Sequence, residues 1–99
     1  MSHSIYAVLY VAVLWRLRGD YMTHDLKILP EYYEQVVKGR KNFELRKDDR
    51  DYHVGDMVRF HEYKDGEYTG RKSYLIPILY ILRDCPEYGL MDGYCILGL

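Results

Sequence analysis

The sequence predicts an α+β fold, a small closed or partly closed β-barrel of mostly antiparallel strands with one short helix after the first strand. Short segments that alternate polar and apolar residues recur along the chain, as half-buried strands do. One segment, residues 30–39, instead places its apolar residues at helical spacing. Because the chain has 99 residues and contains no repeats or linkers, it is expected to form one domain around one modest core.

The first strand and the helix are predicted close together. Residues 24–29, HDLKIL, alternate polar and apolar side chains, which indicates a strand with one buried face. Pro30 follows, at a position that the first turn of a helix tolerates. The helix is expected to end at Gly39, because glycine readily adopts the positive φ found just past a helix C-terminus. The buried helix face is predicted to consist of Tyr33, Val36 and Val37.

The rest of the chain reads as strands separated by turns and one charged loop. The predicted segments are strands at 41–47 and 57–63, a hairpin connection at 64–70, a longer strand at 72–82 and a last strand at 94–99. Pro77 has no backbone N–H, so it indicates a bulge or a sheet edge within the longer strand. Asp92 and Gly93 predict the turn into the last strand.

Composition excludes several classes of protein. Fourteen basic and fifteen acidic residues give a net charge of −1, so any anion site must be local rather than a uniformly basic coat. Twelve tyrosines offer both packing surface and platforms for stacking bases. Cys85 and Cys95 suit a reducing compartment, and no disulfide framework is expected. The four histidines match no zinc spacing, so neither a metal nor a cofactor is predicted.

The first residues form an apolar leader. Residues 5–15 are apolar but fall short of the roughly 20 residues needed to cross a bilayer. They also lack the basic n-region and the cleavage site of a signal peptide. Arg18-Gly19-Asp20 permits purine-rich codons like a ribosome-binding site just before Met22, so translation is expected to begin often at Met22. We therefore expect residues 1–21 to lie outside a domain of residues 22–99, which has no membrane partner and is cytoplasmic.

The most informative stretch is GRKNFELRKDDR, residues 39–50. Gly39, Lys41, Glu44 and Arg46 satisfy the pattern G-x-K-x-x-E-x-R, directly after a predicted helix and running into a predicted strand. Side chains alternate along a strand, so Glu44 and Arg46 are expected on one face and Phe43 and Leu45 on the other, buried face. The remaining KDDR is predicted to be a rim and turn of mixed charge.

The motif in this context resembles the ASCH domain, a PUA-like β-barrel superfamily associated with RNA. The segments RKDDRDYHVGD, HEYKDGEYTGR and EYGLMDGYCILGL are similar to one ASCH branch, the DUF3850 family of small bacterial and phage proteins. The resemblance covers about Thr23 to Leu99. It implies a cleft at the mouth of the barrel, lined by the motif residues and suited to RNA or a nucleotide.

The chemistry of the motif agrees with that expectation. Lys41 supplies a point charge for phosphate, Arg46 a planar fork for phosphate or a base edge, and Glu44 an acceptor for an exocyclic amine. The alternative is that Glu44 and Arg46 form only a structural pair that orients the strand. The other candidate residues are Arg40, Lys47 and Arg50 as an anion-steering rim, and Tyr63, Tyr68 and Tyr52 as either stacking platforms or packing residues.

Two other functions stay open. Amidohydrolases of the superfamily that act on acetylcytidine also carry Gly-x-Lys and a closing Arg, but they have a Thr nucleophile at the position of Glu44. This chain lacks that nucleophile, although a Lys41–Glu44 pair can still act as a general base. A protein-interaction adaptor is the third possibility. The sequence leaves the RNA type, the nucleotide and the oligomeric state undetermined.

Overall fold

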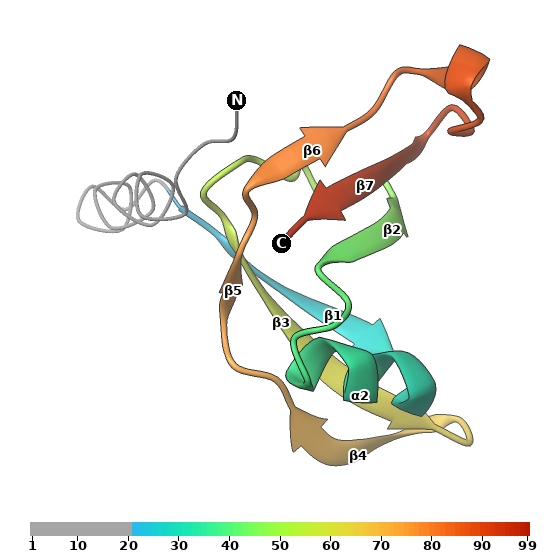
Figure 1. The fold of residues 1–99 in the computed structure, drawn as a ribbon. Helices are drawn as coiled ribbons and strands as arrows, with labels where there is room; N and C mark the ends of the chain where they lie inside the picture. Colours follow the sequence, from blue (N-terminus) through green and yellow to red (C-terminus); the bar gives the residue numbers. More distant parts are fainter. Residues whose placement is uncertain (1–20) are drawn as a thin grey trace.

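The computed structural model describes residues 21–99, so residues 1–20 of the predicted leader lie outside the described part of the chain. Two sheets and one α-helix make up this part (Figure 1). The elements are β1 (Thr23–Ile28), α2 (Pro30–Val37), β2 (Phe43–Lys47), β3 (Met57–Lys64), β4 (Glu67–Lys72), β5 (Ile76–Pro77), β6 (Tyr80–Leu82), the 3₁₀-helix η1 (Pro86–Tyr88) and β7 (Tyr94–Gly98). The predicted α+β class, with mostly antiparallel strands and a short helix after the first strand, is confirmed.

The first sheet has the strand order β1-β3-β4, and β5 also pairs with β3. β1 pairs with β3 in parallel, with Leu26 opposite Phe60, and the other pairings of this sheet are antiparallel. β1 and most of β3 alternate buried and more exposed residues, so each strand has one core face and one outer face. The helix α2 covers the core face, as Figure 1 shows.

The second sheet has the order β2-β7-β6 and is entirely antiparallel. Its inner face carries Cys95 and Leu97 of β7, which are both fully buried. Its outer face is apolar and exposed: Phe43 and Tyr80 lie on either side of Gly98, and the next row is Leu45, Ile96 and Leu82. The chain passes between the two sheets three times: from β1 through α2 to β2, from β2 to β3, and from β5 to β6.

Local sequence explains both ends of α2. Pro30 is the first helical residue, and the Leu29 carbonyl accepts from Tyr33 N–H at 2.9 Å. At the other end, Gly39 has φ +72° and donates to the Val36 carbonyl, while Arg40 N–H donates to the Gln35 carbonyl. These two bonds form a Schellman motif, as the predicted glycine cap requires. Tyr33 and Val36 are buried as predicted.

One core lies between α2 and the sheets. It consists of Leu26, Ile28, Tyr33, Val36, Tyr52, Val58, Phe60, Ile78, Cys95 and Leu97. Buried polar groups beside it are paired: the Asp56 carboxylate bonds His24 Nε2 at 2.8 Å and accepts the backbone N–H groups of Met22 and His53. These bonds fix the start of β1 to the turn that precedes β3.

Two segment predictions are wrong. Only Asp65 and Gly66 form the turn after β3, and residues from Glu67 onward pair with β3 as β4. The predicted strand at 72–82 is broken into β5 and β6, because two successive residues between them donate their backbone N–H groups to different parts of the fold. Ile78 N–H donates to the Asp56 carbonyl and Leu79 N–H to the Gly98 carbonyl. Pro77 lies in β5, within the short strand that pairs with β3.

The predicted barrel is not confirmed, because the pairings among residues 21–99 leave two sheets that are not closed into one. In this part of the chain, no group of His, Cys, Asp and Glu side chains is arranged to hold a metal ion. None of its helices is long and apolar enough to cross a membrane.

Candidate functional site

The two faces of β2 are the reverse of the prediction. Glu44 is 7% exposed and points inward with Arg46, whereas Phe43 and Leu45 are 50% and 56% exposed. The alternation itself is as predicted, but the buried set is the charged one. A buried carboxylate is tolerated when cations pair with it and satisfy its oxygens, and both neighbours of Glu44 in the motif do so.

Three motif side chains form one ion-paired network. Lys41 Nζ donates to Glu44 Oε1, and it also donates to the Phe43 carbonyl at 2.8 Å. Arg46 Nε donates to Glu44 Oε2 at 2.8 Å, so each oxygen of the carboxylate accepts from a different cation. The network carries one more positive than negative charge.

Aromatic rings surround the Lys41 ammonium. Its nitrogen lies 5.2 Å from the ring centre of Phe43, 5.9 Å from that of Tyr32 and 5.8 Å from that of Phe60. Cation–π attraction to these rings, together with the bond to Glu44, holds the ammonium in a fixed place. Lys41 has three N–H donors, and its bonds to Phe43 and Glu44 use two of them.

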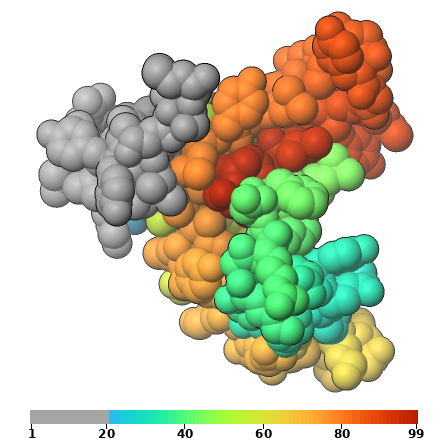
Figure 2. Space-filling view, viewed as in Figure 1, coloured from blue at the N-terminus to red at the C-terminus, as the bar shows by residue number. Residues whose placement is uncertain are grey.

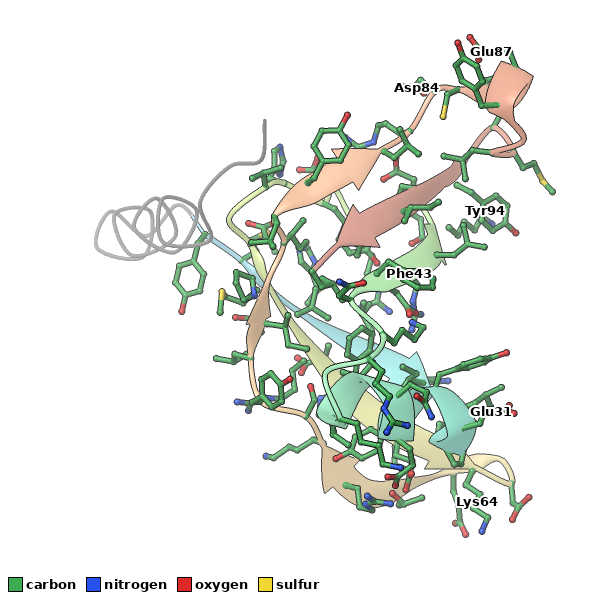
Figure 3. All side chains as sticks on the ribbon, viewed as in Figure 1. Glu31, Phe43, Lys64, Asp84, Glu87 and Tyr94 are labelled. Carbon is green, nitrogen blue, oxygen red and sulfur yellow. The ribbon has the colours of Figure 1, made fainter. Side chains whose placement is uncertain are left out.

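A cavity of about 500 Å³ opens beside this network. It is lined by Tyr32 and Gln35 of α2, Arg40 and Lys41 of the connection, and Phe43, Glu44 and Leu45 of β2. Figure 3 shows Phe43 at the start of β2, near α2. In Figure 2 the residues of α2 and β2, in green, lie together on the visible face. The cavity therefore combines aromatic rings with two cations and an amide.

Arginine side chains bridge the first sheet to the second. Among residues 21–99, β1 is an edge strand, so alternate backbone carbonyls on its open side have no hydrogen-bond partner in another strand. Arg46 Nη2 donates to the Lys27 carbonyl, and Arg50 Nη1 donates to the Asp25 carbonyl at 2.9 Å. Arg46 and Arg50 thus donate to two carbonyls of β1. In a closed barrel, the backbone N–H groups of another strand would donate to such carbonyls instead.

The loop after β2 is also held by specific contacts. Arg83 donates to the Asp48 carboxylate at 2.6 and 3.2 Å, and this pairing raises the pKa of Arg83. Asp48 is therefore a structural partner rather than part of the predicted solvated rim. Tyr52 is 2% exposed, which makes it a packing residue and not a stacking platform, and burial raises its pKa.

The structure places only one of the remaining predicted residues at the cavity and distributes the others over three other places. Arg40 lies at the cavity, while Lys47 is exposed on the outward face of β2. Tyr63 and Tyr68 lie elsewhere, on the outer face of the first sheet, opposite each other in β3 and β4. Arg50 is exposed, but it is engaged with the edge of β1.

Sequence reasoning missed four of the cavity residues: Tyr32, Gln35, Phe43 and Leu45. Tyr32 and Gln35 are three apart on α2 and directly precede the buried Tyr33 and Val36. A polar and an aromatic residue at this spacing form a second helix stripe beside the core stripe. That stripe, next to the motif, is a signal that was present in the sequence.

Comparison with known proteins places the chain in a family. The family described as a domain of unknown function, DUF3850, matches residues 23–99. The chain belongs to the DUF3850 family. A relative of this DUF3850 protein is an uncharacterized 12.9 kDa protein in the GpA 3′ region of Escherichia phage P2, 43% identical over 49 residues. The match covers 50% of this chain and 45% of the phage protein, so it spans about half the length of that relative.

Proposed function

We propose that this DUF3850 protein binds RNA or a nucleotide in the cavity between α2 and β2. The observation that carries the proposal is the set of groups at this one cavity: exposed rings, cations and a side-chain amide around an ion-paired carboxylate. A nucleotide presents the complementary groups, namely a flat base, hydrogen-bonding base edges and an anionic phosphate.

The base is proposed to stack on Phe43 or Tyr32. Both rings are about half exposed at the cavity, although large apolar surfaces are normally buried. Gln35 offers an amide that both donates and accepts, which suits a base edge. A cavity volume of about 500 Å³ lies within the range of small-molecule sites.

The phosphate is proposed to bind Arg40 and the remaining donor of Lys41. Arg40 is exposed, and its guanidinium can bind a phosphate in bidentate fashion. Lys41 is held in place by its bonds to Glu44 and the Phe43 carbonyl, so little side-chain entropy is lost when it meets an anion. Because the chain as a whole carries a net charge of −1, the phosphate is attracted only by the cations at this local site. Its affinity is therefore expected to fall as the salt concentration rises.

We further propose that the domain is a divergent ASCH-type, PUA-like fold in the cytoplasm. Two motif residues, Lys41 and Glu44, line the cavity, and Arg46 lies beside it, where its guanidinium joins Glu44 to the edge of β1. This arrangement supports a ligand site at the place where that superfamily's cleft is expected. At the edge of β1, the hydrogen bonds from Arg46 and Arg50 to backbone carbonyls take the place of the strand pairing that a complete barrel needs.

Calorimetric titration of the full chain with AMP, GMP, CMP and UMP in low salt tests the cavity. Phe43→Ala is expected to weaken binding on the order of 10-fold, because stacking on one ring contributes about 1–3 kcal/mol. Tyr80→Ala is the matched control, since Tyr80 is exposed on the same sheet face but does not line the cavity. Arg40→Ala is paired with Lys38→Ala in the same way. Equal affinity in all four variants and wild type would remove the cavity as the site.

A hydrolase acting on an acylated nucleoside is the second candidate, and the Lys41–Glu44 contact is the observation that favours it. Its weakness is chemical. Both carboxylate oxygens accept from cations, and the described residues that line the cavity include no Ser, Thr or Cys. Incubation with N4-acetylcytidine, followed by detection of acetate, tests it. Acetate release by wild type would favour the enzyme over the binding module, and its loss in a Glu44→Gln variant that circular dichroism shows to be folded would assign Glu44 to the reaction.

A further inference from the structure

A second cluster of rings and cations lies on the outer face of the first sheet, opposite the face that α2 covers. Tyr63 and Tyr68 meet edge to face with ring centres 5.1 Å apart. The Lys27 ammonium lies 4.5 Å from the centre of the Tyr63 ring and 5.8 Å from that of Tyr68. His61 meets Tyr68 edge-on at 6.2 Å. Tyr68 is nevertheless 58% exposed, so its ring remains open to a further stacking partner.

This cluster borders a cavity of its own. The cavity has a volume of about 340 Å³ and is lined by Asp25, Leu26, His61 and Tyr68. His61 Nε2 lies 2.7 Å from Asp25 Oδ1, and this contact fixes the imidazole beside Tyr68. The spacing of Asp25 and His61 in the sequence does not predict this contact, because it arises from the pairing of β1 with β3.

Arg59 lies on the same sheet face and has no ion-pair partner among residues 21–99. Arg59 lies opposite Asp25 in the β1–β3 ladder, and it alternates with the core residues Val58 and Phe60. Within residues 21–99, its Nε is buried without a hydrogen-bond partner, and its guanidinium makes no ion pair. A ligand cannot reach this buried Nε directly, but Arg59 as a whole is only partly buried, so its positive charge can attract an anionic ligand on this sheet face.

The two clusters are separated by the edge of β1, where the guanidinium groups of Arg46 and Arg50 lie close to one exposed carboxylate, that of Asp25. Arg46 contacts the Lys27 carbonyl there, and Arg50 contacts the Asp25 carbonyl. Arg46 also contacts Glu44 at the first cavity. Lys27, whose carbonyl accepts from Arg46, places its ammonium over the Tyr63 ring. Basic groups therefore continue from one aromatic cluster to the other.

We propose that the ligand is a single-stranded nucleic acid that crosses the edge of β1, with one base at the Phe43 cavity and another on Tyr68. The inference rests on the proposed function and narrows it from a nucleotide to a strand. Bases stack on the two aromatic clusters, while Arg46 and Arg50 meet the phosphates between them and Arg59 meets the phosphate beyond. The length bound is on the order of four nucleotides, at the low end for a single small domain.

The test is a length series of oligoadenylates, made as both RNA and DNA, competed against a fluorescein-labelled octamer on the full chain. Wild type is expected to bind the octamer more tightly than AMP by at least 10-fold. Tyr68→Ala is expected to lose most of that difference while its affinity for AMP stays unchanged. Tyr68→Phe is expected to bind like wild type, because stacking uses the ring.

The control is Tyr74→Ala, because Tyr74 is 57% exposed and borders neither cavity. Arg59→Gln is expected to reduce the salt dependence of octamer binding by about one phosphate contact. If Tyr68→Ala and Tyr74→Ala bind the octamer equally, the strand path is overturned, even if AMP still binds at Phe43. If wild type binds neither AMP nor the octamer, the proposed function itself fails. Comparison of the RNA and DNA arms decides which strand is preferred.

Discussion

Replacing Glu44 by Gln tests whether the buried network stabilises the fold. The Glu44 side chain, taken alone, is 10% exposed, and its carboxylate is shared by Lys41 and Arg46, whose side chains are 14% and 23% exposed. Removing one partner of a buried ion pair costs roughly 3–5 kcal/mol. The cost here is smaller, because Lys41 keeps the Phe43 carbonyl and Arg46 keeps the Lys27 carbonyl. We expect a loss of about 2–3 kcal/mol, with the domain still folded.

Urea unfolding followed by far-ultraviolet circular dichroism measures that loss. In thermal unfolding of a domain of this size, the same loss of stability is expected to lower Tm by roughly 10–20 °C. Glu67→Gln is the control, since Glu67 is an exposed carboxylate on β4, and a change within about 0.5 kcal/mol is expected there. Lys41→Met combined with Glu44→Gln is expected to cost less than the sum of the single variants, because both remove the same ion pair. Equal stability of Glu44→Gln and wild type would refute the network.

Three further outcomes follow from the fold. Burial raises the pKa of the Cys95 thiol from 9.0 to about 11, so its contribution to stability, on the order of 2–3 kcal/mol, is complete below pH 9 and is lost as the pH rises through 11. Urea midpoints measured between pH 8 and 11 should therefore fall more steeply in wild type than in Cys95→Ala. Asp56→Ala leaves three donors without their acceptor, and a loss of about 3 kcal/mol in the free energy of unfolding is expected; exposed Asp92→Ala should change it little. Gly39→Ala forces φ +72° on an alanine without any contact within 4 Å, so the same measurement should show a loss of about 1 kcal/mol from backbone strain alone.

Local chemistry made α2 and β3 predictable from the sequence. Within a helix, proline fits only the first turn, and a glycine at positive φ fits just past the end, so the two bounds of α2 follow from backbone sterics rather than from tertiary contacts. β3 alternates over eight residues, long enough for the pattern to be unambiguous. The parallel pairing of β1 with β3 leaves no such local signal, because it depends on the path of the whole chain between them.

β2 shows the limit of pattern reasoning most clearly. Alternation divides FELRK into two sets, but it does not say which set faces inward. Hydrophobicity favours burial of Phe43 and Leu45, and the structure buries Glu44 instead. The expected orientation is reversed because Lys41, three residues before Glu44, and Arg46, two residues after it, neutralise the Glu44 charge inside the fold. A charge pair has to be weighed together with the apolar pattern at such a position.

The same reversal changes how the motif must be tested. Lys41, Glu44 and Arg46 hold one another and the edge of β1, so the structural role that the sequence allowed for Glu44 and Arg46 is present in the contacts. A variant at any of the three removes part of the fold as well as a candidate ligand contact. Weaker binding in Lys41→Ala or Arg46→Ala therefore has two explanations. Arg40 borders the same cavity but takes no part in the ion pairs or in the rings around Lys41, so loss of binding in Arg40→Ala has only one explanation. Phe43 also stands outside the ion pairs, but its ring contacts the Lys41 ammonium, so Phe43→Ala is read together with Arg40→Ala.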